Sequence, residues 1–284
     1  MIQQVNHLSQ FKNTLRKIQW KLNNPPQFLN THRHIIFKFS SDKKTFIYRK
    51  AKFSSDQIKR QVIANQLFKE YTPKILFYND DCIIEEYIIG QNLHLNTEPH
   101  IWQQFSTILS NIHAINSSNY GVLKTISSGI YNSFKDFIKP DLQKFPIIYN
   151  QKVISSKEIK QLEEYILNPP PSGTPNQRVC HGDIWPANII YNKKTSKITL
   201  IDWENISSLS PEYDLYGFSE STHPKVVKIY KDIKKYYNQP LNQELIDYYG
   251  LLFIVSRYSS VTDYQQKPIA LNNALLSKKH LFTK

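Results

Sequence analysis

Two short motifs decide how the chain is interpreted: residues 181–190 read HGDIWPANII, and residues 200–204 read LIDWE. Phosphoryl transfer needs a carboxylate beside the attacking hydroxyl group and oxygen ligands that hold magnesium against the nucleotide phosphates. Asp183, Asn188 and Asp202 together supply that set of groups. A lone His-Gly-Asp would be a weak signal, but two motifs at this spacing indicate phosphoryl-transfer chemistry.

The local sequence predicts a β-hairpin between these motifs. Apolar residues 189–191 and 198–201 read as two strands, joined by the polar turn 192–197. Gly182 and Pro186 shape a loop before the first strand. Such a hairpin brings Asn188 and Asp202 close together.

The motifs resemble the catalytic core of the aminoglycoside phosphotransferase and choline kinase superfamily, whose members are small-molecule kinases with a protein-kinase-like fold. The resemblance runs from about Phe28 to the C-terminus, and its specificity lies between His181 and Asp214. It implies an α+β, two-lobed fold with a small antiparallel-sheet lobe at residues 1–89 and a mostly helical lobe at residues 90–284. The layout is most similar to the bacterial thiamine kinase and choline kinase branch.

The resemblance also implies cofactors and catalytic roles. ATP and Mg²⁺ are the implied cofactors. Asp183 is expected to orient the substrate hydroxyl group and accept its proton, while Asn188 and Asp202 hold the metal. His181 is expected to support the loop, because a general base already stands two residues away.

Two further acidic residues are expected to support the site. Glu204 completes the Asp-Trp-Glu motif, which stands where protein kinases have Asp-Phe-Gly. Asp214, in Tyr213-Asp214-Leu215, resembles the family's Asp-Leu pair, whose aspartate braces the catalytic loop.

A predicted strand over residues 45–50 resembles the strand that carries the phosphate-gripping cation in the family. Arg49 is the first choice for that cation and Lys50 the second, because adjacent strand residues face opposite ways. The alternative is an exposed basic pair at a strand end.

A helix is predicted after this strand, and it departs from the family pattern. Ser54 and Gln57 match a Ser-x-x-Gln capping box, followed by apolar residues at helical spacing. Kinase-like folds usually place a glutamate in this helix to pair with the cation, but the matching position is Gln61. A glutamine can hydrogen-bond to an arginine, so this departure leaves the fold prediction standing and the ion pair in question.

The nucleotide loop is a second departure. Nucleotide-binding loops often use glycine, yet no glycine occurs before Gly90. Residues 28–33 take the place of that loop, and Asn30 is the candidate for a positive φ angle in glycine's stead. A kinase-like fold that has lost nucleotide binding therefore remains an alternative.

Residues 82–89 read as a strand that leads to the hinge between the lobes. The resemblance places backbone groups of Glu86, Tyr87 and Ile88 against the adenine edge. The alternative is a buried edge strand without a ligand. An amphipathic helix follows from Pro99 onward, and His113 in its apolar stripe is interpreted as a structural core residue.

Composition excludes several other classes of protein. The 284 residues carry a formal net charge of +13, but the lysines are scattered and form no nucleic-acid-binding module. The two cysteines show no metal-ligand spacing, and the longest apolar run is too short to cross a bilayer. We therefore expect a cytoplasmic protein that binds a small-molecule hydroxyl substrate, with no nucleic-acid or membrane partner; the oligomeric state stays open.

Three functions remain in view: a small-molecule kinase, a catalytically silent kinase-like binding protein, and a protein kinase. The protein kinase is disfavoured because His-Arg-Asp, Asp-Phe-Gly and Ala-Pro-Glu sequences are all missing. Retention of Asp183, Asn188 and Asp202 together favours the active enzyme, whereas the glycine-free loop favours the silent binding protein.

The acceptor is expected to be a small cationic alcohol, with thiamine or choline/ethanolamine leading and an aminoglycoside or a sugar such as a fructosamine as alternatives. Acidic residues gather around the hairpin, and the local field of a cleft outweighs distant lysines. Aromatic rings, which attract cations, are also plentiful in the C-terminal half. The acids are Asp183, Asp202, Glu204, Glu212, Asp214 and Glu220, and the rings include Trp185, Trp203, Tyr213, Tyr248, Tyr249 and Tyr258.

Overall fold

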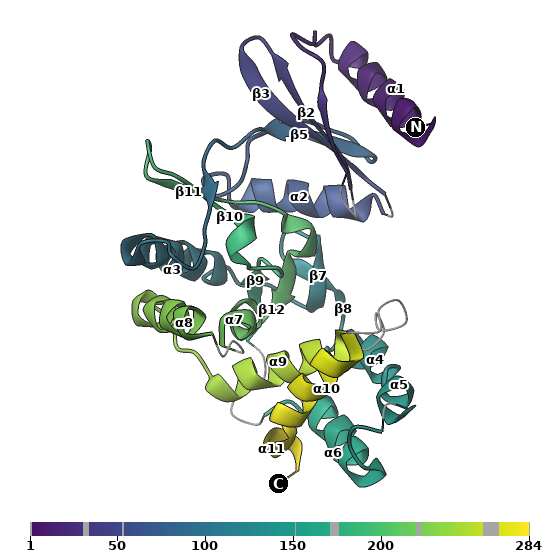
Figure 1. Cartoon of the computed structure of the whole chain (residues 1–284), viewed down its shortest axis with the longest axis vertical. Helices are drawn as coiled ribbons and strands as arrows, with labels where there is room; N and C mark the ends of the chain where they lie inside the picture. Colours follow the sequence, from purple (N-terminus) through teal and green to yellow (C-terminus); the bar gives the residue numbers. More distant parts are fainter. Residues whose placement is uncertain are drawn as a thin grey trace. The chain divides into compact units, whose positions relative to one another are not determined.

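The computed structural model describes residues 2–30, 34–52, 54–150, 152–170, 176–219, 223–257 and 267–283. The chain forms two compact units (Figure 1). Unit 1 contains Met1–His94 and Trp185–Ile206, and unit 2 contains Leu95–Ile184 and Ser207–Lys284. The first segment of unit 1 ends five residues beyond the predicted boundary at residue 89, and the predicted hairpin belongs to unit 1.

Unit 1 is built on a five-stranded antiparallel sheet in the order β1-β2-β3-β5-β4. Its strands are β1 (Gln27–Asn30), β2 (His34–Ser41), β3 (Lys44–Ala51), β4 (Ile75–Tyr78) and β5 (Cys82–Glu86). Helix α1 (Ile2–Lys17) covers one face, where Phe11 stacks on Phe37 with ring centroids 4.8 Å apart. Helix α2 (Asp56–Leu67) lies on the other side of the sheet (Figure 1).

The predicted β-hairpin is confirmed. Strand β10 (Ile189–Asn192) pairs antiparallel with β11 (Lys197–Leu200), in the register Ile189 to Leu200 and Asn192 to Lys197. A short strand β6 (Gln91–Asn92) adds to the outer edge of β10. One 3₁₀ turn, η1 (Pro186–Asn188), precedes the hairpin, and a second, η2 (Trp203–Asn205), follows it.

Unit 2 is mostly helical, with a small sheet in the order β8-β7-β12-β9. Helix α9 (Gln243–Arg257) is apolar nearly all round and buries Tyr248, Tyr249 and Leu251 in a hydrophobic cluster of the unit, as its sequence predicts. No helix of the described part is long and apolar enough to cross a membrane. The helices are α3 (Pro99–His113), α4 (Phe134–Leu142), α5 (Phe145–Asn150), α6 (Ser156–Leu167), α7 (Glu212–Ser219), α8 (Pro224–Tyr236), α9 (Gln243–Arg257), α10 (Lys267–Ser277) and α11 (Lys279–Phe282), and the strands are β7 (Tyr120–Thr125), β8 (Ser128–Tyr131), β9 (Arg178–Cys180) and β12 (Ser207–Leu209).

The capping box predicted at the start of α2 is wrong. The N-cap residue is Ser55, whose side chain makes no capping bond, and Ser54 Oγ accepts from the Asp56 N–H at 3.2 Å. The side chain of Gln57 is used elsewhere, because its Nε2 donates to Glu204 Oε2 at 3.0 Å. A tertiary contact thus replaces the local one that the sequence pattern predicts.

Candidate active site

The proposed metal ligands lie at the same end of the hairpin in unit 1. Ile189 is paired with Leu200, and the Ile201 N–H donates to the Asn188 carbonyl at 2.9 Å. Asp202 follows directly in the left-handed conformation, with φ 68° and ψ 51°, which few residues other than glycine adopt. Its side chain is 32% exposed. An amide and a carboxylate oxygen are ligands of the kind that Mg²⁺ prefers, so Asn188 and Asp202 fit this metal.

Arg49 faces this end of the hairpin from β3. Its Nη1 donates to Asp202 Oδ1 at 2.8 Å, and its Nη2 donates to Glu85 Oε1 at 3.1 Å. Both Arg49 and Glu85 are buried. Burial lowers the pKa of Arg49, but Glu85 and Asp202 outweigh it and raise that pKa above its ordinary value. The guanidinium group therefore stays charged.

Lys50, the second choice for the cation, lies on the other face of the sheet. Its Nζ donates to Gln10 Oε1 of α1 at 3.1 Å, at an exposed position. Strand alternation explains the difference, because consecutive side chains of β3 point to opposite faces. Tyr48, two residues before Lys50, packs in the core under α1. Arg49 is therefore the residue that contacts Asp202.

Helix α2 holds the segment that follows Asp202. Gln61 is buried, and its Oε1 accepts from the Trp203 N–H at 3.0 Å. One residue earlier, Arg60 Nε donates to the Glu204 carbonyl. Gln61 thus fixes the backbone beside Asp202, whereas the carboxylate partners of Arg49 come from β5 and from the end of the hairpin.

Glu204 is a buried acceptor for several donors. Its Oε2 lies 3.1 Å from His34 Nε2 and 3.0 Å from Gln57 Nε2. Ligand-capable atoms of His34, Asp202 and Glu204 all lie within 4.8 Å of one another. These contacts fit the predicted supporting role of Glu204, because they fix the turn that carries Asp202.

The structure differs from the sequence prediction at the nucleotide loop. Asn30 is the last residue of β1 and pairs with Ile35, so its backbone is extended and the expected positive φ angle is not found there. Residues 31–33 lie outside the described residues. Residues 28–30, which the sequence analysis assigned to the loop, belong to β1, because β2 supplies a partner for every residue of that strand.

The backbone of the predicted hinge is partly committed to neighbouring strands. The Glu86 N–H donates to the Lys74 carbonyl at 2.9 Å, and the Tyr87 N–H donates to the Thr45 carbonyl at 3.1 Å. These two bonds do not use the Glu86 carbonyl or the Ile88 N–H.

The loop that carries Asp183 belongs to unit 2, and Asp214 at the start of α7 holds it. Asp214 accepts from the His181 N–H at 2.7 Å and from the Gly182 N–H at 2.8 Å. Gly182 has φ 85°, a conformation that favours glycine. His181 is buried, and its Nδ1 accepts from the Asp183 N–H at 3.3 Å. The geometry is that of a supported loop, as the sequence predicts for His181 and Asp214.

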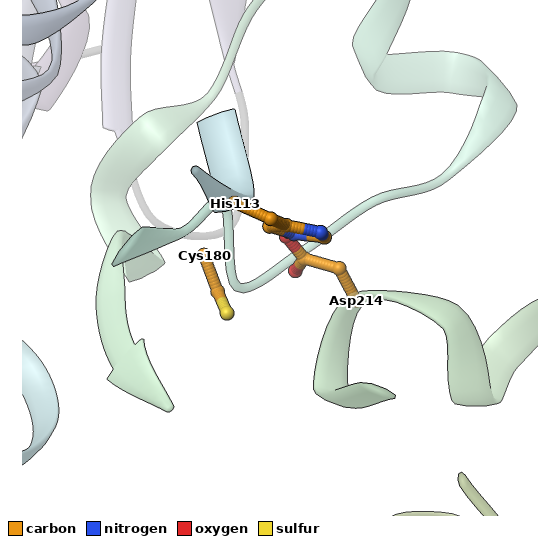
Figure 2. A group of neighbouring side chains, drawn as sticks. All are labelled: His113, Cys180 and Asp214. Atoms are coloured by element: carbon orange, nitrogen blue, oxygen red, sulfur yellow. The ribbon is translucent and has the colours of Figure 1, made fainter. Parts of the chain in front are cut away.

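His113, Cys180 and Asp214, the residue that holds this loop, form a buried cluster (Figure 2). His113 bridges Asp214 Oδ2 at 3.0 Å and the Tyr237 hydroxyl at 2.7 Å. Burial raises the pKa of Asp214, but the hydrogen bond from His113 and the neighbouring donors outweigh it, and the pKa lies below its usual value. His113 is a core residue, as predicted, and it stabilises the charged form of Asp214.

Cys180 of this cluster is held as a thiol. Burial raises its pKa well above the ordinary value, and Asp214 adds to that rise. Its Sγ donates to the carbonyl groups of Leu209 and Ser210 at 3.5 and 3.4 Å. Metals bind the thiolate form of cysteine, whereas Cys180 is a thiol. Its hydrogen bonds therefore account for the cluster without a bound metal.

Aromatic rings accompany Asp183 in unit 2. The ring centroids of Tyr213 and Tyr216 are 5.7 Å apart, and Tyr216 lies 5.0 Å from Phe253. Burial raises the pKa of both tyrosines, and the charge of Asp183 raises them further, which places this carboxylate within electrostatic range of both. Asp141 adds a second carboxylate near Tyr213, and burial raises its own pKa to about 6.

Other aromatic residues expected near a cationic substrate fill the core instead. Trp203, Tyr248 and Tyr249 are fully buried. Glu220 and Tyr258 lie outside the described residues. The sequence reasoning missed Glu85, which the β3–β5 register places on the same face of the sheet as Arg49; local sequence pattern does not show that register.

Comparison with known proteins adds a family and a fold. A family model described as choline/ethanolamine kinase matches residues 13–252. No curated protein sequence matches the chain. A thermostable mutant of aminoglycoside phosphotransferase APH(4)-Ia superposes with a TM-score of 0.70 at 16% identity, covering 95% of this chain and 98% of that chain.

Two other solved structures are similar. Choline kinase LicA from Streptococcus pneumoniae gives a TM-score of 0.69 at 14% identity, covering 97% of this chain and 99% of that one. A macrolide 2'-phosphotransferase type I gives 0.66 at 13% identity, covering 98% and 97%. The predicted kinase-like fold, with an antiparallel-sheet N-terminal part and a helical C-terminal part, is confirmed.

Proposed function

Because the chain belongs to the choline/ethanolamine kinase family, we propose that it transfers the γ-phosphate of ATP to a small cationic alcohol in an Mg²⁺-dependent reaction. Family membership makes it a phosphotransferase that acts on the hydroxyl group of a small molecule. Choline, ethanolamine and thiamine are the leading acceptors.

One observation carries the phosphoryl-transfer part of the proposal. Asp202 stands at the open end of the hairpin in a left-handed conformation and pairs with Arg49 at 2.8 Å. Uncommon backbone conformations of this kind persist where the surrounding structure holds them, and they cluster at functional sites. The Arg49 cation and the Asp202 carboxylate are the two groups that a metal-bound triphosphate requires at this place.

The nucleotide is assigned to unit 1. Arg49 binds the α- and β-phosphates, Asn188 and Asp202 hold Mg²⁺, and the Glu86 carbonyl and Ile88 N–H bind the adenine edge. Bound Mg²⁺ supplies charge neutralisation at the phosphates. A likeness of fold supports this assignment, because similar structures are complexes of APH(4)-Ia with ADP or AMP-PNP and of APH(2'')-Ib with ADP.

Asp183 is assigned as the general base. Proton transfer needs a carboxylate that is held in a fixed position and stays ionised at the working pH. The hydrogen bonds from His181 and Gly182 to Asp214 fix the backbone on which Asp183 stands. Asp183 then orients the acceptor hydroxyl group and takes its proton as the γ-phosphate is attacked.

The acceptor is assigned to the surroundings of Asp183 in unit 2. Ring faces of Tyr213 and Tyr216 attract a cation by about 0.5 to 2 kcal/mol each. Asp183 and Asp141 lie within electrostatic range of Tyr213. The face of Phe253 is occupied by Arg257, whose guanidinium carbon lies 4.7 Å from the ring centroid, so this ring is not assigned to the acceptor. The rings of Tyr213 and Tyr216 and the nearby carboxylates support a small cation over a neutral sugar.

A turnover screen tests the proposal. The full chain is incubated with ATP and Mg²⁺, and ADP release is measured with choline, ethanolamine, thiamine, an aminoglycoside, a fructosamine and a neutral sugar. Asp183→Asn serves as the inactive control. We expect release to rise with at least one of the first three compounds. Turnover of the aminoglycoside or a sugar alone would overturn the acceptor assignment, and ATP binding without turnover of any acceptor would favour a silent binding protein.

A further inference from the structure

Arg49 divides its two terminal nitrogens between two carboxylates: Nη1 bonds to Asp202 and Nη2 bonds to Glu85. We propose that Glu85 positions Arg49 for the nucleotide phosphates, in place of the glutamate that α2 lacks. This inference rests on the proposed function, because it assumes that Arg49 binds phosphate. Glu85 is a positioning residue, since it acts through Arg49.

The register of the sheet explains why Glu85 can reach Arg49. In the β3–β5 pair, Arg49 stands opposite Ile83 and Ile47 stands opposite Glu85. Glu85 and Arg49 are therefore diagonal neighbours on one face, a separation that long side chains bridge. The intervening residues Tyr48 and Ile84 face the α1 core instead. The pair is thus built into the strand register and does not depend on the position of a helix.

Helix α2 supplies no buried acid for this purpose. The acidic residue of α2 is Asp56, its first residue, which is exposed and pairs with Lys59 at 3.5 Å. Gln61, at the expected position, carries no charge and is committed to the Trp203 N–H. Glu85 on β5 is therefore the carboxylate outside the hairpin that anchors Arg49.

Glu85 keeps its role when a metal binds. Asp202 is the proposed metal ligand, so a bound Mg²⁺ competes with Arg49 for its carboxylate. Glu85 is 3% exposed, whereas the Asp202 side chain is 32% exposed. A buried guanidinium without a counter-charge is costly, and Glu85 still provides one after Asp202 turns to the metal.

Arg49 also has N–H groups that its two carboxylate bonds do not use. In the part of the chain that the structure describes, its buried Nε has no hydrogen-bond partner. A guanidinium group has five N–H donors in a planar fork, and a fork held at one nitrogen can present the others to phosphate oxygens. Glu85 thereby fixes the plane of the fork as well as its charge.

The test compares binding of Mg·ADP and of adenosine, which lacks phosphates, by calorimetry on the full chain. The variants are Glu85→Gln, which is isosteric and neutral, and Glu70→Gln, which changes the net charge equally at an exposed position of unit 1. We expect Glu85→Gln to reduce the preference for Mg·ADP over adenosine by about tenfold, because a hydrogen bond between charged groups is lost. The affinity of Glu85→Gln for adenosine should not change, and Glu70→Gln should bind both compounds as the wild type does.

Each outcome decides between the proposals. A preference for Mg·ADP that is unchanged or increased in Glu85→Gln would overturn the positioning role and leave the proposed function standing. A wild-type chain without any preference for Mg·ADP would overturn the nucleotide assignment itself. If Glu85→Gln does not fold, Glu85→Asp decides instead: it keeps the charge but shortens the anchor, and an undiminished preference would contradict the proposal.

Discussion

Asp214 Oδ2 lies 3.0 Å from His113 Nε2, with both side chains fully buried, and the same carboxylate receives the backbone N–H groups of the loop before Asp183. One acidic group thus links the amphipathic helix α3 to the loop that carries Asp183. The cost of burying a charge is offset only because every one of these donors is present.

Replacing Asp214 should therefore destabilise unit 2. We expect Asp214→Asn to lower the free energy of unfolding by about 3 kcal/mol or more, because a buried imidazole and two backbone donors lose their charged acceptor. Tyr237→Phe, which removes only the hydroxyl group on the far side of His113, should cost about 1 kcal/mol. Urea unfolding measures both, and equal losses would contradict the central place of Asp214.

The Asp214 carboxylate should also make the free energy of unfolding depend on pH. The pKa of Asp214 is lowered in the folded protein, so its contribution is present above the unfolded-state pKa, about 3.9, and is lost as the pH falls through the folded-state value. The stability difference between wild type and Asp214→Asn should be constant from pH 7 to 5 and shrink below about pH 4. A difference that stays constant down to pH 3 would contradict this.

Asp183→Asn should separate chemistry from binding. Loss of the general base should reduce kcat by roughly 10² to 10⁴, while affinity for Mg·ATP stays the same, because the assigned nucleotide ligands are elsewhere. Asp80→Asn, an exposed substitution of the same type, is the matched control. Near-normal turnover of the identified acceptor by Asp183→Asn would refute the assignment.

Asp202→Ala should impair the metal-dependent part of nucleotide binding. We expect the gain in ADP affinity on adding Mg²⁺ to disappear, because the carboxylate ligand is lost and Arg49 keeps only Glu85. Calorimetric titration with and without Mg²⁺ measures this gain. If the gain survived intact, Asp202 would not be a metal ligand.

Acceptor binding should respond to the ionisation of Asp141. Burial raises its pKa to about 6, so the carboxylate is neutral below that pH and charged above it. A cationic acceptor should therefore show a falling KM as the pH rises from 5 to 7, and Asp141→Asn should remove this dependence. The kcat of the variant is the control, since Asp141 has no assigned part in the chemistry. A neutral acceptor would show no such change in KM.

Local pattern by itself determined much of this protein. The spacing of Asp183, Asn188 and Asp202 around two short apolar runs predicted both the chemistry and the hairpin, because strands joined by a polar turn pair with their nearest neighbours in sequence. Strand alternation likewise predicted that only one of Arg49 and Lys50 faces the site. The short strands β7 and β8, with serine and glycine and no clear alternation, were not predicted.

Tertiary structure decided which groups serve those motifs. Gln57 bonds to Glu204 instead of forming the predicted capping bond. Gln61 bonds to the Trp203 backbone, and Glu85 is a partner of Arg49. Asn30 joined a strand because β2 offered it a partner. These pairings depend on contacts between residues far apart in the sequence, or on which strand lies alongside. Buried polar groups must bond to one another, because water is excluded from the core. Short-range spacing carries no information about such partners, so the sequence determined the chemical groups and the fold determined their pairing.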